Sequence, residues 1–329
     1  MGSIVNNGKS GADGAAYGAE SGQDDTGAEG VGADILASEA LDIYTDDSCN
    51  LSQEWLTKHE VGLLPLSVML DGAECPETLR EAPGQFYTAI REGARPSTSS
   101  IVRGRVEEAF KNSAKRGRDI LYIGLPAVLS SNFAQVGDIA KRIASECSQR
   151  ICCMDARLAT MGHGMLVEEA VRLRGEGRPL TTIHNMLEKL SDHIRILFIL
   201  DDPQYLKVSG RGEEALKWAG RFISKLSVKL LLTINRQCSP KFHSAHRSRK
   251  GAIGHMMEYL HAKIDRARDQ VIYVVHADIP RLAEMLVSAV RETLGANQRV
   301  EIAEVPPVLG AHVGPGTVAL IFMSAEARS

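Results

Sequence analysis

Two short segments of the sequence gather hydroxyl groups beside a predicted helix start. In residues 95–104 (RPSTSSIVRG), four consecutive hydroxyl residues follow Pro96. In residues 124–135 (GLPAVLSSNFAQ), Ser130 and Ser131 stand between a predicted strand and a predicted helix. Hydroxyl groups and free backbone N–H groups at a helix N-terminus can bind an anion without any positively charged side chain. Taken alone, each segment is more typical of ordinary helix capping than of anion binding.

A histidine among glycines near the end of the sequence is a third candidate. His312 lies in a predicted loop with Gly310, Gly314 and Gly316, just before an apolar run (LGAHVGPGTVALIFM, residues 309–323). Glycine allows the backbone to approach a bound group closely. The pattern therefore favours a histidine that donates to a carboxylate or phosphate. The alternative is a structural histidine bonded to a backbone carbonyl.

Other polar residues are weaker candidates. Asp46 and Asp47 follow a predicted strand, but no second acidic cluster accompanies them, so turn and helix-start roles are favoured over acid/base or metal chemistry. Arg211 lies between two glycines and is interpreted either as an anion ligand or as a solvated loop residue. The basic stretch 236–250, with His243 and His246, is interpreted as a solvated face or a docking surface.

Composition and missing motifs exclude several classes of protein. The net charge of −3 and the 5% aromatic content argue against nucleic-acid binding. No apolar run approaches the roughly 18 residues that span a bilayer, although transient membrane contact is allowed. The six cysteines have no CxxC spacing, which indicates reduced thiols in a cytoplasmic protein. A P-loop, a nucleophile elbow, HExxH and a dinucleotide fingerprint are all absent. We therefore predict no cofactor and no metal site.

The elements that must position these residues alternate between strands and helices. Residues 1–36 are predicted to be disordered, residues 37–195 to form an N-terminal α/β domain and residues 196–329 a C-terminal α/β domain. The alternation predicts mainly parallel sheets flanked by helices, with ligands at the carboxyl ends of strands. Strands are predicted over residues 41–48, 61–70, 119–125, 150–156, 194–200, 228–234, 271–277, 299–305 and 317–323. Helices are predicted over residues 84–93, 105–117, 132–147, 163–177, 180–193, 213–225, 249–267 and 280–295.

Taken in order, these stretches resemble the DegV family from about residue 42 to residue 323. The segment at residues 307–316 (PVLGAHVGPG) matches the family's closing block most specifically. Residues 95–104 resemble its PTTSQPSPG block, and residues 128–135 (VLSSNFAQ) resemble its LSGTYQSA block. Further similar segments are YTDDSCNL (44–51), MDARLATMGHGML (154–166), YLKVSGR (205–211), AHRSRKGA (245–252) and VVHADIP (274–280).

The resemblance implies a two-domain DegV-like protein that binds one long-chain fatty acid in an apolar tunnel and is not itself an enzyme. In that family a threonine and a serine of the two hydroxyl blocks hold the carboxylate, near the histidine of the GAH loop. Some members present the acid to a separate fatty-acid kinase subunit, which phosphorylates the carboxylate. Carried over, this gives Arg211 as a possible support for phosphotransfer. The implied fatty-acid-binding residues are Thr98, Ser99, Ser130, Ser131, His312 and Gly314.

Some residues depart from the family pattern. Ser131 and Asn132 replace its Gly and Thr, and Val208 and Ser209 interrupt the run before Arg211. A carrier nevertheless fits the chemistry, because burying an acyl chain gains about 0.8 kcal/mol per methylene and the head group then needs only neutral donors. Two alternatives stay open: a small-molecule enzyme of a dihydroxyacetone-kinase-like type that uses the GAH histidine, and a regulatory protein with a vestigial pocket.

Overall fold

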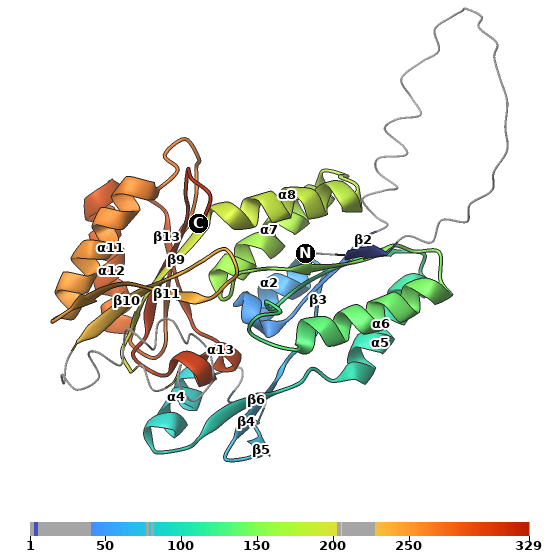
Figure 1. Ribbon diagram of the computed structural model, residues 1–329, viewed down its shortest axis with the longest axis horizontal. Helices are drawn as coiled ribbons and strands as arrows, with labels where there is room; N and C mark the ends of the chain where they lie inside the picture. Colours follow the sequence, from blue (N-terminus) through green and yellow to red (C-terminus); the bar gives the residue numbers. More distant parts are fainter. Residues whose placement is uncertain are drawn as a thin grey trace, which may run out of the picture.

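The computed structural model describes residues 3–5, 41–76, 79, 82–202, 205 and 228–328. Within these residues the chain forms two larger sheets, each with its own helices, and a small third sheet beneath the seam between them (Figure 1). The predicted disordered tail and the predicted helix over residues 213–225 lie outside the described residues, except for the short strand β1 (Ser3–Val5).

The first sheet has five strands in the order β1-β8-β7-β2-β3. The pairs among β2, β3, β7 and β8 are parallel, and β1 joins β8 in the antiparallel direction. Two helix pairs, α5 with α6 and α7 with α8, cover its faces (Figure 1). The bounds are β2 (Leu41–Thr45), β3 (Val61–Leu63), β7 (Asp119–Gly124), β8 (Ile151–Asp155), α5 (Arg103–Lys115), α6 (Asn132–Glu146), α7 (Met161–Gly175) and α8 (Leu180–His193). The 3₁₀ turn η1 (Asp47–Cys49) and the short helix α2 (Gln53–Lys58) connect β2 to β3.

The second sheet has six strands in the order β11-β10-β9-β14-β12-β13. Among its described pairs, β12–β13 is parallel and the others are antiparallel. Helices α11 and α12 cover one face, and the other face packs toward the first sheet (Figure 1). The bounds are β9 (Ile194–Leu200), β10 (Lys229–Ile234), β11 (Pro240–His246), β12 (Ile272–His276), β13 (Val300–Glu304), β14 (Val318–Met323), α11 (Arg249–Lys263) and α12 (Pro280–Leu294).

Strand β9 is apolar at almost every position because both of its faces are buried. Leu197 and Ile199 belong to the core beneath α11 and α12, whereas Ile196 and Phe198 belong to the core shared with the first sheet. A strand that is buried on both faces needs an almost continuous apolar run rather than an alternating one. The interface between the two sheets is therefore part of the hydrophobic core.

The third sheet, in the order β5-β4-β6, packs against the later of two short helices near the seam, and the two helices contact each other. It consists of β4 (Ser67–Leu70), β5 (Ala73–Glu74) and β6 (Pro96–Ser99). The helices are α4 (Pro83–Arg91) and α13 (Pro307–Val313). Through β6, this small sheet places the hydroxyl residues 97–99 beside α13.

The α/β fold is confirmed, and several local predictions need correction. The second sheet is mixed rather than mainly parallel. The single strand predicted over residues 61–70 is two strands in different sheets, because Pro65 interrupts the run. Ser97 to Ser99 form strand β6 rather than a loop before a helix. His312 lies in the last turn of α13 rather than in a loop. The boundary between residues 195 and 196 stays a prediction.

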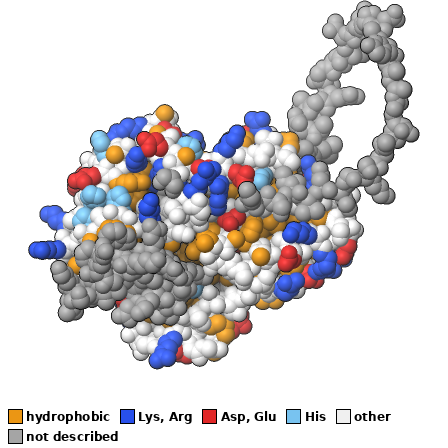
Figure 2. All heavy atoms as spheres, in the orientation of Figure 1, with side chains coloured by type: hydrophobic (Ala, Val, Ile, Leu, Met, Phe, Trp, Pro, Cys, Tyr) orange, Lys and Arg blue, Asp and Glu red, His pale blue; other side chains and the backbone are white. Residues whose placement is uncertain are grey.

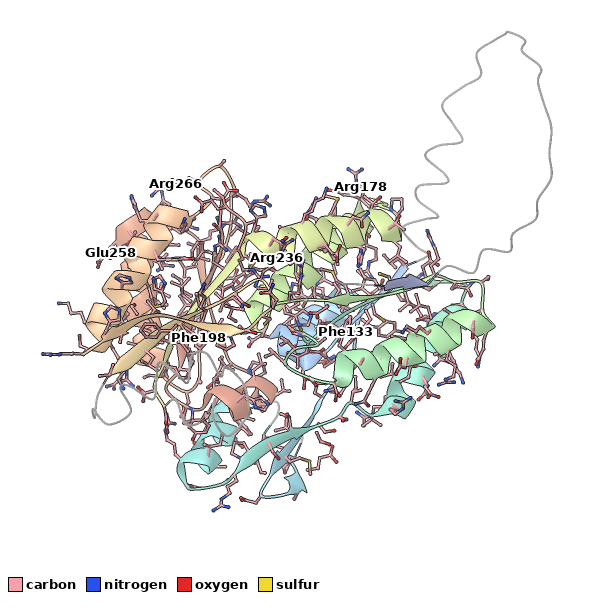
Figure 3. All side chains as sticks on the ribbon, viewed as in Figure 1. Phe133, Arg178, Phe198, Arg236, Glu258 and Arg266 are labelled. Carbon is pink, nitrogen blue, oxygen red and sulfur yellow. The ribbon has the colours of Figure 1, made fainter. Side chains whose placement is uncertain are left out.

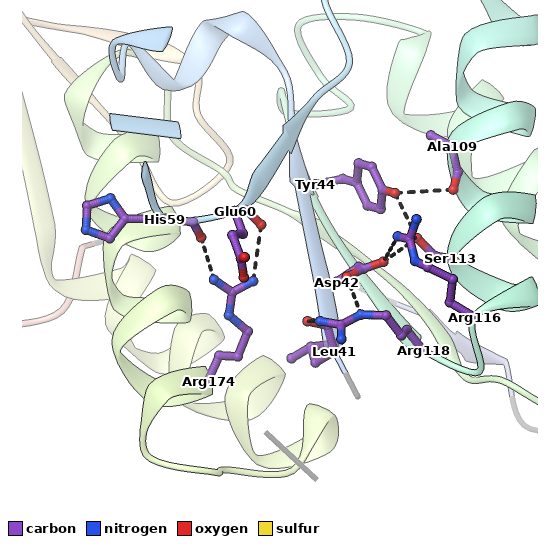
Figure 4. Close-up of polar contacts among 10 residues, drawn as sticks. All are labelled: Leu41, Asp42, Tyr44, His59, Glu60, Ala109, Ser113, Arg116, Arg118 and Arg174. Atoms are coloured by element: carbon purple, nitrogen blue, oxygen red, sulfur yellow. Dashed lines mark hydrogen bonds and ion pairs between the residues drawn. The ribbon is translucent and has the colours of Figure 1, made fainter. Parts of the chain in front are cut away.

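Ion pairs close the amino ends of the strands in the first sheet (Figure 4). The Asp42 carboxylate accepts hydrogen bonds from Arg118 Nε at 2.5 Å, Arg116 Nη2 at 2.7 Å and the Ser113 hydroxyl at 2.5 Å. Burial alone would raise the pKa of Asp42, but these three donors lower it overall. The cluster lies at the end of the sheet opposite the loops that follow β7 and β8, so we interpret it as structural.

Candidate functional site

A cavity of about 120 Å³ lies where the loops of the first sheet meet the inner face of the second. Figure 2 shows hydrophobic side chains along this seam, and Figure 3 labels Phe198 on β9, which lines the cavity. Most lining residues are apolar, and no Asp, Glu, Lys or Arg occurs among the described residues that line it. The polar lining residues are Thr98, Ser99, Ser130, Asn132, Thr160, His312 and Thr317.

Thr98 and His312 meet at the cavity although they are 214 residues apart in the chain. Thr98 is held on β6 by antiparallel pairing with Val68 of β4, and His312 projects from the last turn of α13. The Thr98 Oγ1 and His312 Nε2 atoms are 3.0 Å apart, and which of them donates depends on the imidazole tautomer. A hydroxyl group and an imidazole from distant parts of the chain therefore place polar atoms side by side at one apolar space.

The second hydroxyl segment reaches the cavity through the loop between β7 and α6. Ser130 lines the cavity, and its Oγ accepts a hydrogen bond from Asn132 N at 3.2 Å. The Asn132 side chain in turn accepts a hydrogen bond from Ile101 N at 2.9 Å. This buried asparagine ties the second hydroxyl segment to the residues that follow the first. Ser131 is exposed and is not among the described residues that line the cavity, so its place in the site stays a prediction.

Two helices begin at the cavity, which gives it a positive electrostatic end without a charged side chain. Helix α6 starts at Asn132, and helix α7 follows Thr160; both residues line the cavity. Thr160 does not cap its own helix, because its hydroxyl donates to Asn50 Oδ1 at 3.2 Å. Helix N-termini carry a partial positive charge and free N–H groups, so together these two ends favour an anion in the cavity.

A buried polar network supports the loop that carries Ser130. Asp46 caps η1 through Ser48 N at 3.0 Å, which is the helix-start role predicted for it. Its second oxygen accepts from Tyr122 Oη at 3.0 Å and from Leu125 N at 2.7 Å. Because Leu125 begins the loop after β7, this carboxylate fixes the start of the hydroxyl segment.

His163 also belongs to this support. It is fully buried under the same loop, with Ser48 Oγ 3.1 Å from Nδ1 and with Thr45 Oγ1 and the Ile123 carbonyl oxygen each 3.1 Å from Nε2. Burial lowers its pKa, although nearby Asp46 opposes the shift. Since His163 does not line the cavity, we interpret it as a structural histidine.

The glycines beside the candidate histidine make room for protein side chains. A Cβ atom on Gly310 would lie 2.4 Å from Tyr87 Oη, and one on Gly314 would lie 2.3 Å from Tyr205 Cδ2. Gly314 also has a φ of +70°, in the left-handed region that glycine adopts readily. Gly314 is not among the described lining residues and packs closely against the Tyr205 ring, so its approach to a ligand stays a prediction.

Replacing Gly310 with alanine is therefore expected to destabilise the fold by about 2 kcal/mol, the usual range for overpacking a filled site. The new methyl group would displace Tyr87, whose hydroxyl donates to the Val305 carbonyl at 2.8 Å. Gly137→Ala in α6 is the matched control, since nothing lies within 4 Å of its Cβ position. That change should stabilise by roughly 0.5–1 kcal/mol. Equal unfolding free energies for the two variants in urea would contradict this account.

Sequence reasoning missed some residues of the site. Asn132 and Thr160 line the cavity, and neither was proposed as a ligand. A signal existed for both, because each is a polar residue between the carboxyl end of a parallel strand and a helix start. Arg211, the predicted support for phosphotransfer, lies outside the described residues.

The arrangement can hold an acidic head group next to an apolar space. Neutral donors from Thr98, Ser130 and His312, together with two helix N-termini, suit a carboxylate. A hydroxyl beside an imidazole also resembles part of a nucleophile–base pair, but no described lining residue is a carboxylate that could orient the imidazole. In the described part of the chain, no helix has the length and apolar character needed to cross a bilayer.

Comparisons with known proteins identify relatives of this chain. A family model described as "Uncharacterised protein, DegV family" matches residues 40–325. A DegV domain-containing protein of Clostridium perfringens is 27% identical over 284 residues, which cover 85% of this chain and 96% of that protein.

Similar solved structures come from the same family or carry a related description. One is a DegV family protein from Thermus thermophilus, described by its fatty-acid binding, with a TM-score of 0.72 and 22% identity; the match covers 87% of this chain and 99% of that one. A stearic acid-binding protein from Eubacterium ventriosum has a TM-score of 0.72 and 19% identity, with 86% and 98% of the two chains covered. At these identities the likeness establishes the fold.

Proposed function

The chain belongs to the DegV family, and from this premise we propose that it is a cytoplasmic carrier for one long-chain fatty acid. The carboxylate binds at Thr98, Ser99, Ser130 and His312, and the acyl chain runs along the apolar seam between the two sheets. The observation that carries the proposal is the 3.0 Å contact of Thr98 Oγ1 with His312 Nε2 at an apolar cavity whose described lining has no charged side chain.

The energetics support a lipid rather than a small polar ligand. Each buried methylene contributes about 0.8 kcal/mol, so a long acyl chain supplies most of the affinity and the head group needs few contacts. The acyl chain would lie against the apolar side chains that line this cavity, such as Phe198. The free thiols of all six cysteines fit the proposed cytoplasmic location.

The proposed role includes presenting the carboxylate to a fatty-acid kinase subunit, which converts it to an acyl phosphate. Neutral donors suit this step, because they stabilise a carboxylate without the tight ion pair that a lysine would form. On this proposal the chain is a carrier and the chemistry belongs to the kinase. Arg211 remains the proposed support for phosphotransfer.

The direct test is mass spectrometry of lipid extracted from the purified, denatured protein. We expect a single class of long-chain fatty acid at up to one equivalent per chain, and uptake of a labelled fatty acid at micromolar protein. A protein that contains no acyl chain and takes up none would contradict the carrier proposal.

The second candidate function is a small-molecule enzyme that uses His312, and the hydroxyl–imidazole contact with Thr98 is the observation that favours it. The variant His312→Ala separates the two. In a carrier it should leave fatty-acid binding largely intact, because Thr98 and Ser130 still hold the carboxylate and the buried acyl chain supplies most of the affinity. It should slow phosphorylation by an added kinase, because the imidazole beside the carboxylate is lost. In the enzyme it should abolish turnover of a carbonyl or phosphorylated substrate. Turnover by the unaltered chain without any kinase would favour the enzyme.

A further inference from the structure

A β-bulge on the edge strand β11 gathers histidines that the sequence spaces apart. Leu231 of β10 pairs with Ser244 of β11, but the next residue of β10, Leu232, pairs with Phe242, so His243 is the extra residue. In a regular strand, His243 and His246 would point to opposite faces. The bulge instead turns His243 toward the face that Ser244 and His246 occupy.

Helix α11 adds a third histidine on this face. The His255 ring centroid lies 5.3 Å from that of His243 and 5.3 Å from that of His246. Tyr259, one turn further along α11, meets the His243 ring edge-on at 5.2 Å. Figure 2 shows histidine side chains at the surface over this helix, far from the seam that holds the cavity.

Two of the imidazoles already have the partners that orient histidines in metal sites. His255 Nδ1 lies 3.2 Å from Glu258 Oε2, and His246 Nε2 lies 2.8 Å from Ser244 Oγ. Metal-bound histidines usually give their second ring nitrogen to a carboxylate or another oxygen, which fixes the ring and its tautomer. If these two contacts are kept, His255 Nε2 and His246 Nδ1 are the ring nitrogens that can bind a metal ion.

We propose that His243, His246 and His255 bind one divalent transition-metal ion of the zinc type, with water completing its coordination. Ring nitrogens lie about 2.0–2.1 Å from zinc, so two imidazoles at a tetrahedral angle have ring centroids about 5 Å apart. Both measured separations from His255 are close to that value. Among the described residues, no group of three or more His, Cys, Asp or Glu side chains is placed to hold a metal ion, so the three imidazoles must move closer to a common point than they lie in the structure.

Two charged side chains lie near the cluster and bear on a bound cation. Lys229, which pairs in register with His246, is itself bound to the Asp201 carboxylate at 2.5 Å. Glu258 supplies negative charge beside the proposed ion.

A metal at this position would fasten the edge strand β11 to helix α11. An edge strand has one unpaired side, and tying it to a helix limits its motion. Pro240, at the opposite end of β11, lines the cavity, so the same ion would hold one cavity wall in place. The inference revises the sequence-based prediction of no metal site, because the bulge is not visible in the spacing of the histidines.

The experiment is titration of the full chain with Zn²⁺ by calorimetry and with Co²⁺ by visible absorption, at pH 7.5. We expect one equivalent of each ion to bind, with absorption bands that indicate nitrogen ligands. His255→Gln and His243→Gln should each weaken binding at least about tenfold. His261→Gln on the same helix is the matched control and should leave binding unchanged. Absence of binding, or binding that the first two variants do not alter, overturns the proposal.

Discussion

A protein with valine in place of Thr98 is expected to bind a long-chain fatty acid about tenfold to a hundredfold more weakly than the unaltered chain. Hydrogen bonds to a charged group contribute about 1.5–3 kcal/mol, and every 1.4 kcal/mol changes affinity tenfold. Valine keeps the branched shape of threonine on β6 but removes the hydroxyl that lies 3.0 Å from His312 Nε2. Equilibrium titration with a fluorescent or radiolabelled fatty acid measures the change.

Two controls make this experiment specific for the head group. Ser97→Ala, next to Thr98 on β6 but exposed and outside the cavity lining, should leave the affinity unchanged. The methyl ester of the same fatty acid carries no negative charge, so it should lose little affinity when Thr98 is replaced. If Thr98→Val binds acid and ester as the unaltered chain does, the carboxylate lies elsewhere in the cavity.

The proposed site depends on an anion held without a cationic side chain. The described lining has no lysine or arginine, and the positive potential comes from the starts of α6 and α7. Such an arrangement is weaker than an ion pair, but inside an apolar cavity even partial charges act with little screening. It leaves the carboxylate oxygens open to chemistry, which suits a carrier more than a permanent binding site.

The part of the site that lies on the first sheet could be predicted from sequence periodicity. Ser130 follows a buried parallel strand and precedes a helix, and the carboxyl ends of parallel strands meet at one edge. Thr98 could not be placed in this way. Four small polar residues in a row have no alternation, and β6 exists only because it pairs with β4. The resemblance to a family, rather than periodicity, singled out Thr98 from these residues, whereas the glycines around His312 already marked it as a candidate.

Other features depend on contacts that no local pattern contains. Gly310 is a glycine because Tyr87, more than 200 residues earlier, occupies the space of its missing side chain. The bulge at His243 arises from the register of β10 against β11. Pro65 signalled an interruption, but the separation of its two flanking strands into different sheets reflects tertiary packing. In each case the local sequence is compatible with the observed structure, but a contact with a distant part of the chain determines that structure.

The variant Glu168→Gln is expected to be more stable than the unaltered chain at pH 8, by about 2–3 kcal/mol. Glu168 lies on α7 where it meets the second sheet, and it accepts the Tyr273 hydroxyl at 3.2 and 3.1 Å through its two oxygens. Burial raises the pKa of Glu168 to about 7, and the Glu301 charge adds to the shift, while Tyr273 opposes it. Each unit of pKa shift corresponds to about 1.4 kcal/mol.

The sign of this effect follows from proton linkage. Because the folded state holds the Glu168 proton more tightly than the unfolded state, its favourable contribution is complete below about pH 4.5 and is lost as the pH rises through about 7. Glutamine cannot ionise and still accepts the tyrosine hydrogen bond. The variant should therefore match the unaltered chain near pH 4.5 and exceed it increasingly up to pH 8.

Urea unfolding at several pH values measures this difference, and the neighbouring residue provides the control. Glu169 forms an ion pair with Arg172 on the outer side of the same helix, so Glu169→Gln should lower stability by no more than about 0.5 kcal/mol at pH 8. A gain for Glu168→Gln that does not vary with pH would mean that the carboxylate ionises normally. The junction between α7 and the second sheet would then be more accessible to water than the burial of Glu168 implies.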